Sequence, residues 1–284
     1  MKLIPSVAMP TWITGLKVIK SRCGICHRSL ALRHLSAQKA GIRMHGTWYC
    51  SARCFRSAAE QEVLRLLKTG TEQAAHVSRM PLGLNLINHG VLTIEQLKKA
   101  TDEQKESGGE IGEVLVRQGS VSEKQVTAVR ATEWGCPVFT VPKHAIQIGI
   151  NLPSTLMRIY FMIPVHYVVR TNLLLVGFVH NVEYGLLYAI EQVTGCETKP
   201  CFVTPSDFQT QMQQQQKELE QSGFTPGREL KFENIQTAAE IAHTLCTSGV
   251  ETEAEEAFIG KCKEYIWARL KSGPQAIDFL FRAG

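Results

Sequence analysis

The chain has 284 residues, of which 44% are hydrophobic and 20% are charged. This composition is typical of a globular protein, it excludes a largely disordered chain, and the length allows two or three small domains. The net charge of +5 is uneven, because residues 1–76 carry 12 Lys and Arg against 3 Asp and Glu, whereas residues 77–284 carry 19 against 23. The resulting charges of +9 and −4 predict a basic N-terminal module joined to a mildly acidic body.

The sequence does not predict a membrane segment. The first twenty residues contain Pro5 and Pro10 and lack a clear small-residue cleavage site, so they do not read as a signal peptide. The most apolar internal stretch, residues 159–179, is interrupted by Pro164 and Arg170, whereas a spanning helix needs ~18 uninterrupted apolar residues. We therefore expect a cytoplasmic protein without a transmembrane segment, which protein partners could hold at an inner-membrane complex.

Four cysteines of the basic module form two close pairs, Cys23 with Cys26 and Cys50 with Cys54, and 23 residues separate the pairs. Two such pairs are typical of a tetrahedral Zn²⁺ site. The first pair lies in a Cys-Gly-Ile-Cys turn, and the second has the i, i+4 spacing of a helix that we expect to begin near Ser51. Because four thiolates fill the coordination sphere, the predicted zinc is structural rather than catalytic.

Two alternatives to this ligand set are open. His27, His34 or His45 could replace a cysteine, or all the cysteines could be reduced and buried without a metal. The segment HGTWYCSARCF resembles treble-clef or TRASH-like zinc fingers, in which a Tyr-Cys-Ser-x-x-Cys segment begins the helix. The charge of the module suits contacts with the phosphates of nucleic acid or anionic lipid, but we prefer the interpretation that the module docks a protein partner.

The segment Pro81–Glu133 contains one 24-residue pattern twice, at an offset of 29 residues. The first copy is PLGLNLINHGVLTIEQLKKATDEQ, and the second is EIGEVLVRQGSVSEKQVTAVRATE. Each copy predicts a short helix, a glycine turn and a longer helix. Gly90 and Gly119 stand where a left-handed residue ends the short helix. Thr93 and Ser122 each precede a Gln by three residues, which predicts two capping boxes.

The repeat and the sequence after it, about Met80–Gln214, resemble the N-terminal domain of type II secretion and type IV pilus assembly ATPases, the GspE/PilB/MshE group. WGCPVFTVP is similar to a short strand of that family. Residues 163–212 then predict a strand, a hairpin turn, a strand, a helix, a strand and a helix. The resemblance implies a protein partner in a secretion or pilus assembly, because this domain docks the ATPase onto an inner-membrane platform in the family.

In MshE-type members, two motifs of this length and spacing bind cyclic di-GMP. The resemblance assigns the nucleotide pocket to apolar and glycine positions, which here are Leu82, Gly83, Leu86, Gly90 and Leu97 in the first copy and Ile111, Gly112, Leu115, Gly119 and Val126 in the second. The Arg that opens each motif in the family is replaced by Pro81 and Glu110. Pro donates no hydrogen bond and Glu repels phosphate, so we expect weak or no binding of cyclic di-GMP. Arg79 and Arg117 lie nearby but out of register.

The sequence contains no G-x-x-x-x-G-K-[ST] phosphate loop, no H-E-x-x-H and no G-x-S-x-G. We therefore expect no enzymatic activity and no copy of the family's ATPase motor within these residues. The preferred function is a bacterial adaptor or regulator that docks through the GspE-like domain. A nucleic-acid-binding regulator and an active cyclic di-GMP receptor are the alternatives.

The remaining residues predict a linker and a small C-terminal unit. Residues 215–232 are rich in Gln and then contain Ser-Gly and Thr-Pro-Gly breaks, which is typical of a linker. Residues 233–284 predict a helix over 234–246 and a β-hairpin of residues 265–270 and 276–281. Because one helix and one hairpin are marginal alone, we expect this unit to pack on another domain or subunit. Glu255 and Glu256 are expected in a charged helix. The predicted fold class is thus α+β, with a zinc-finger module at 1–76, a GspE N-terminal-like domain at 77–214, this linker, and an α+β segment at 233–284.

Overall fold

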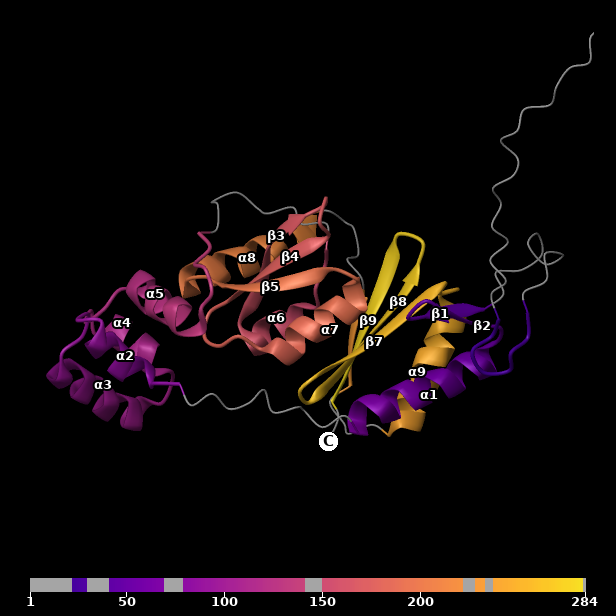
Figure 1. Cartoon of the computed structure of the whole chain (residues 1–284), viewed down its shortest axis with the longest axis horizontal. Coiled ribbons are helices and arrows are strands. Elements are labelled where there is room, and N and C mark those ends of the chain that lie inside the picture. The colour runs from indigo at the N-terminus through magenta and orange to yellow at the C-terminus, as the bar shows by residue number, and fades with distance from the viewer. Residues whose placement is uncertain are drawn as a thin grey trace, which may run out of the picture.

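A computed structural model describes residues 22–29, 41–68, 79–140, 150–221, 228–232 and 237–282. These residues form an α+β structure with two sheets, which confirms the predicted fold class (Figure 1). One sheet has six strands in the order β2-β1-β7-β8-β9-β6, and the other has three in the order β3-β4-β5. No helix in these ranges is both long enough and apolar enough to cross a membrane. The predictions for the first 21 residues and for His34 lie outside the described residues.

The N-terminal module is a short hairpin followed by one long helix. Strands β1 (Ile42–Met44) and β2 (Thr47–Tyr49) pair antiparallel, and α1 (Ala52–Lys68) follows directly. The helix begins one residue after its predicted start because Ser51 caps it, with Oγ accepting a hydrogen bond from the backbone N–H of Cys54 at 3.3 Å. Its inner face buries Phe55, Ala58, Ala59, Val63 and Leu66.

The repeat forms two helical hairpins, as predicted. Its helices are α2 (Leu82–Asn88), α3 (Ile94–Ser107), α4 (Ile111–Arg117) and α5 (Glu123–Trp134). Gly90 and Gly119 both have a φ of +68°, where residues with a Cβ are strained, and both predicted capping boxes are present. The two hairpins share one core of Leu86, Leu92, Ala100, Val114, Leu115, Val121, Val126 and Val129.

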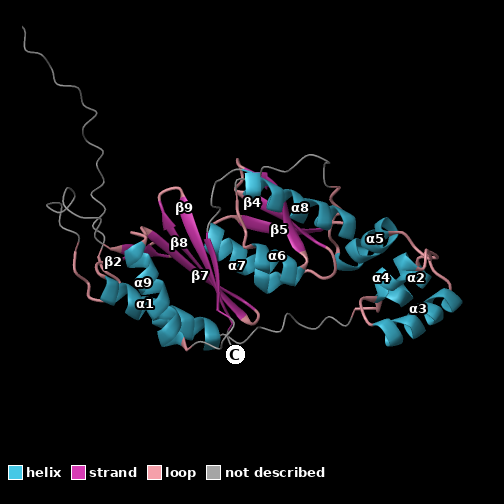
Figure 2. Cartoon of the chain, turned by 180° about the vertical axis from the view of Figure 1, so that it is seen from behind, coloured by secondary structure: helices cyan, strands magenta, loops and turns pink. Residues whose placement is uncertain are grey.

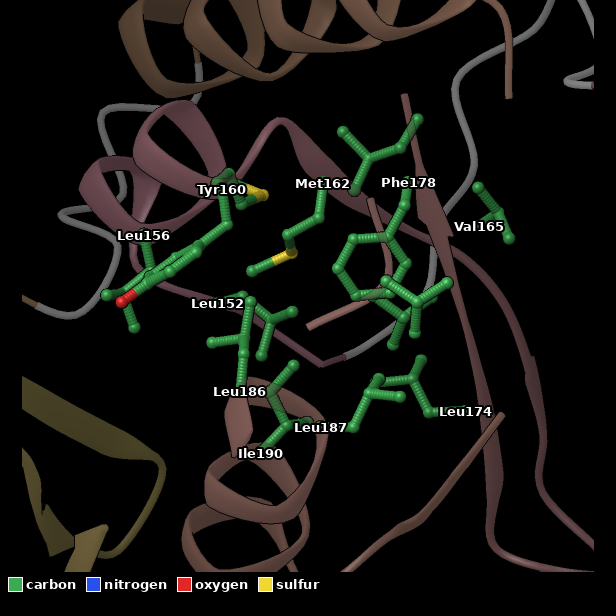
Figure 3. Packing of buried hydrophobic residues seen from close by; sticks show 14 of the residues in the cluster. Leu152, Leu156, Tyr160, Met162, Val165, Leu174, Phe178, Leu186, Leu187 and Ile190 are labelled. Atoms are coloured by element: carbon green, nitrogen blue, oxygen red, sulfur yellow. The ribbon is translucent and has the colours of Figure 1, made fainter. Parts of the chain in front are cut away.

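A small α/β subdomain follows the repeat. Its elements are α6 (Ser154–Tyr160), β3 (Met162–Val168), β4 (Leu173–Phe178), α7 (Tyr184–Thr194), β5 (Glu197–Phe202) and α8 (Pro205–Gln221). All were predicted except α6, and α7 is the crossover between the parallel strands β4 and β5. Where the short strand WGCPVFTVP was expected, Val138 forms a single parallel bridge to Phe202. Apolar side chains from α6, β3, β4 and α7 converge in its core (Figure 3).

The C-terminal segment contains β6 (Arg228–Phe232), α9 (Ala238–Glu251), β7 (Glu256–Cys262), β8 (Tyr265–Ser272) and β9 (Gln275–Arg282). The predicted helix and the β8–β9 hairpin are confirmed. Two expectations were wrong. Glu256 begins strand β7 instead of lying in a helix, because Ala257, Ile259 and Cys262 turn a buried face toward the core. Residues 228–232, assigned to the linker, pair in parallel with β9.

The N-terminal module and the C-terminal segment share one sheet and one core. Strand β1 pairs in parallel with β7, so the sequence division at residues 76 and 233 separates parts that pack together. Helices α1 and α9 lie side by side on the six-stranded sheet (Figure 2). Between them and the sheet, Phe55 and Val63 of α1 are buried together with Leu245 of α9 and Ile266 and Phe279 of the strands. The C-terminal unit therefore packs on another part of the chain, as expected of so small a unit.

Buried polar contacts join this layer to the α/β subdomain. Arg269 donates two hydrogen bonds to Asp278, at 2.8 and 2.9 Å, and one to the backbone carbonyl of Asn151 at 2.6 Å. Glu229 of β6 accepts hydrogen bonds from the backbone N–H groups of Ser154 and Thr155, at 2.9 and 3.3 Å, where α6 begins. These contacts satisfy charges and helix-end donors that would be costly to bury alone.

Candidate metal centre and repeat motifs

The four predicted cysteines come together at the edge of the six-stranded sheet. Their Sγ atoms all lie within 4.8 Å of one another, with Cys26 to Cys50 at 3.4 Å and Cys50 to Cys54 at 3.8 Å. A tetrahedral zinc with Zn–S bonds of about 2.3 Å requires sulfur atoms about 3.8 Å apart. The cluster therefore has the size and the donor set to hold a metal ion.

Local backbone geometry places the first pair of thiols. The backbone N–H of Cys23 donates to the carbonyl of Arg28 at 2.9 Å, which folds residues 23–28 into a tight turn. The N–H of Gly24 donates to the carbonyl of Trp48 at 3.1 Å and fixes this turn against β2. A Cβ at position 24 would lie 2.8 Å from Cγ2 of Thr47, so the close approach requires glycine.

Hydrogen bonding and burial shift the pKa values of two thiols in the cluster in opposite directions. Burial raises the pKa of Cys23, but hydrogen bonds from the backbone N–H groups of Cys50, Cys26 and Ile25 outweigh it and hold this pKa at about 6. Burial, together with hydrogen bonds to the thiols of Cys26, Cys23 and Cys54, raises the pKa of Cys50 to about 12. The Cys23 thiol thus loses its proton more easily than the Cys50 thiol, and a metal ion bound by all four sulfurs would displace the protons that remain.

The two described histidines that could have replaced a cysteine ligand, His27 and His45, lie outside the thiol cluster. His45 accepts a hydrogen bond at Nε2 from the backbone N–H of Ile259 at 3.2 Å, so it links the β1–β2 turn to β7. Burial lowers the pKa of His45, which keeps the imidazole neutral and able to accept. His27 is exposed, and the thiol cluster contains neither residue. Of the other cysteines, Cys196, Cys201 and Cys262 are buried free thiols, whereas Cys136 and Cys246 are half-buried.

The predicted nucleotide-motif residues lie in or against the repeat core. Leu86, Leu115 and Val126 are buried, Leu82, Leu97 and Ile111 pack on them, and Gly90 and Gly119 form the turns. Gly83 lies directly against Leu97, and a Cβ on Gly112 would be 3.1 Å from Leu82 and 3.2 Å from Val126. Each glycine thus lets the short helix of its copy approach the longer helix closely.

The second copy carries a buried arginine that the sequence reasoning did not single out. Arg130 of α5 is 8% exposed, and Nη2 lies 3.4 Å from Oε2 of Glu110, the residue that opens the second motif. Its Nε has no partner among the described residues. The equivalent position of the first copy is Thr101, so the repeat pattern contained no signal for this pair. Pro81, which opens the first motif, makes no side-chain cap.

The two nearby arginines are also engaged. Arg117 donates to Glu103 at 2.6 Å. The guanidinium of Arg79 stacks 3.3 Å from the centroid of the Trp134 ring and lies 4.0 Å from Glu133. Both side chains thus have partners within the part of the chain that the structure describes.

No family model matches the chain. It is 29% identical over 131 residues to the type IV pilus assembly ATPase PilB of Thermus thermophilus, which is 45% of this chain and 14% of that protein. It is 26% identical over 87 residues to PilB of Myxococcus xanthus, 30% of this chain and 15% of that protein. The chain contains a region similar to PilB. The resemblance drawn from the repeat is thereby confirmed, although the match spans only a small part of these relatives.

Two solved structures are also similar to the chain. MshE with cdg is 18% identical, covers 48% of this chain and 99% of its own, and has a TM-score of 0.36. The N-terminal domain of XpsE is 18% identical, covers 47% of this chain and 92% of its own, and has a TM-score of 0.37.

Replacing Gly83 with Ala should destabilise the repeat by about 1–3 kcal/mol, because the new methyl group would overlap Leu97. Gly185 offers a matched control, since it is also the second residue of its helix but has no atom within 4 Å of an added Cβ. Gly185→Ala should stabilise α7 by about 0.5–1 kcal/mol through helix propensity. Urea unfolding followed by circular dichroism measures both, and equal shifts in the two variants would contradict the packing argument.

Proposed function

We propose that the chain is a non-enzymatic bacterial adaptor or regulator that docks through its GspE/PilB N-terminal-like domain to a secretion or pilus assembly. The similarity to PilB over 131 residues carries this proposal. The absence of a phosphate loop from the 284 residues supports a role without nucleotide hydrolysis. The nucleic-acid alternative rests only on the charge of the N-terminal module.

The two copies of the repeat differ in a way that favours docking through the first. Leu84 and Ile94 are 51% and 72% exposed, at the start of α2 and of α3. The second copy has Glu113 and Glu123 at the equivalent positions. Since the same helical unit tolerates glutamate at both places, the leucine and isoleucine are not required for folding. Exposed apolar side chains of this kind suit a protein partner.

The docking role can be tested in the native bacterium by proximity labelling, with a biotin ligase fused to the chain. We expect biotinylation of pilus or secretion components by the wild type and its loss in Leu84→Glu/Ile94→Glu, which carries the residues of the second copy. Val169→Glu, at an apolar residue 77% exposed in the α/β subdomain, should label like the wild type. Labelling without any pilus or secretion component would refute the proposal.

The thiol cluster would hold one structural Zn²⁺ through Cys23, Cys26, Cys50 and Cys54. The proposal rests on the sulfur spacing and on the four-thiol donor set, which leaves no coordination position for a reacting water. The metal would anchor the turn at residues 23–28 to the start of α1. Its role is therefore to stabilise the outer edge of the six-stranded sheet.

Metal analysis of the purified protein should give one zinc per chain, and Cys26→Ser should lose it. Because α1 and β1 share a core with α9 and β7, hydrogen exchange should then increase in residues 41–68 and 237–262. The separate core of the repeat should keep its protection. Cys246→Ser, at a half-buried cysteine outside the cluster, should retain zinc. A metal-free wild type with full protection across the module would disprove the site.

Cyclic di-GMP should bind weakly or not at all. Pro81 donates nothing, and the Glu110 carboxylate both repels phosphate and pairs with Arg130. Arginines at both positions should contribute about 1.5–3 kcal/mol each, so calorimetry should show Pro81→Arg/Glu110→Arg binding at least about a hundredfold more tightly. Glu113→Arg adds a charge outside the motif positions and should not reproduce the gain. Submicromolar binding by the wild type would show that the pocket uses other donors.

A further inference from the structure

A groove of about 570 Å³ lies between the start of α1 and the second half of α9. It does not involve the repeat, so it is independent of the docking function proposed above. Ala52 of α1 and Cys246 and Val250 of α9 form its apolar part. The Cys246 thiol donates to the carbonyl oxygen of Ala52 at 3.3 Å, so the two helices are in contact there. Val250 is 58% exposed, which is a large fraction for an aliphatic side chain at the end of a helix.

Basic side chains flank this apolar surface. Arg53 and Arg56 lie three residues apart on α1, and His243 lies on α9. All three are exposed, and within the described residues neither arginine forms an ion pair with a carboxylate. Glu251, on the last turn of α9, is the one carboxylate among the residues that line the groove. The α1 side of the groove is therefore cationic.

The length and chemistry of the groove suit a short helix. The stretch His243–Glu251 extends about 12 Å along α9, which matches about two helical turns. An amphipathic helix could place two apolar side chains, at i and i+3 or i+4, against Val250 and Cys246. Acidic residues on the flank of the same helix would then face Arg53 and Arg56, which would pair with carboxylates in a geometry suited to arginine.

We propose that this groove docks a short acidic amphipathic helix of a partner protein. The groove adjoins the thiol cluster in sequence, because Cys50 and Cys54 flank Arg53 at the start of α1. The positive charge of the α1 side favours an acidic partner helix. A basic helix would be repelled by the two arginines, and a neutral helix would leave them unpaired.

The test uses the full chain and a fluorescein-labelled peptide of repeating Glu-Glu-Leu-Leu units, with a Lys-Lys-Leu-Leu peptide for comparison. Fluorescence anisotropy should show saturable binding of the acidic peptide and at least about tenfold weaker binding of the basic one. Arg53→Glu/Arg56→Glu should weaken the acidic peptide at least about tenfold. Lys98→Glu/Lys99→Glu makes the same change of charge at exposed residues of α3 and should bind like the wild type.

Circular dichroism and zinc content show whether the arginine variant is folded. If it is not, Val250→Asp replaces it, because this exposed position can change without disturbing the core and should abolish peptide binding. Equal affinity for the two peptides, or unchanged affinity in Arg53→Glu/Arg56→Glu or Val250→Asp, would overturn the proposal. So would light scattering that shows a wild-type dimer converted to a monomer by Val250→Asp, since a second copy would then occupy the groove.

Discussion

The parallel pairing of β1 with β7 determines how the N-terminal module is built. Only three residues form β1, and the ladder contains the bond from the N–H of Arg43 to the carbonyl of Glu255 at 2.9 Å. So few hydrogen bonds contribute little by themselves. The stability must come from the apolar surface that α1 and α9 bury together on the sheet. A module of about fifty residues could not bury such a core alone, and the C-terminal strands complete it.

The pairing of β1 with β7 also determines which part of the module a bound metal would stabilise. The thiol cluster lies against one side of the β1–β2 hairpin, because the backbone N–H of Gly24 donates a hydrogen bond to the carbonyl of Trp48 and Cys50 directly follows β2. The other side is held by β7 and by His45, whose imidazole accepts from Ile259. The hairpin is thus restrained from two directions by different chemistry. Loss of the sulfur ligands would leave the pairing with β7 as its main restraint, so the effect would extend beyond the metal site.

Local features of the fold were predictable, whereas most contacts between distant parts of the chain were not. The capping box of Thr93 and Gln96 and the turn at Gly90 depend on residues a few positions apart, so periodicity and spacing revealed them. The thiol cluster was predictable because the chemistry of a metal identifies its ligands at any separation. The pairing of Arg43 with Glu256 across the chain had no such signal. Neither did the contact of Arg130 with Glu110, which the first copy of the repeat lacks.

The two helical hairpins of the repeat make different contacts with the rest of the chain. The second contacts the α/β subdomain: Glu123 accepts from the backbone N–H of Ser206 at 3.2 Å, and His180 lies 3.9 Å from Glu113. The first hairpin projects away from that subdomain, with α3 at the far end of the molecule (Figure 1). Its exposed Leu84 and Ile94 are therefore available to a partner, because the second copy already provides the attachment. A repeat in which one copy anchors and the other presents apolar side chains suits a docking role better than a symmetric ligand pocket, in which both copies would need equivalent polar donors.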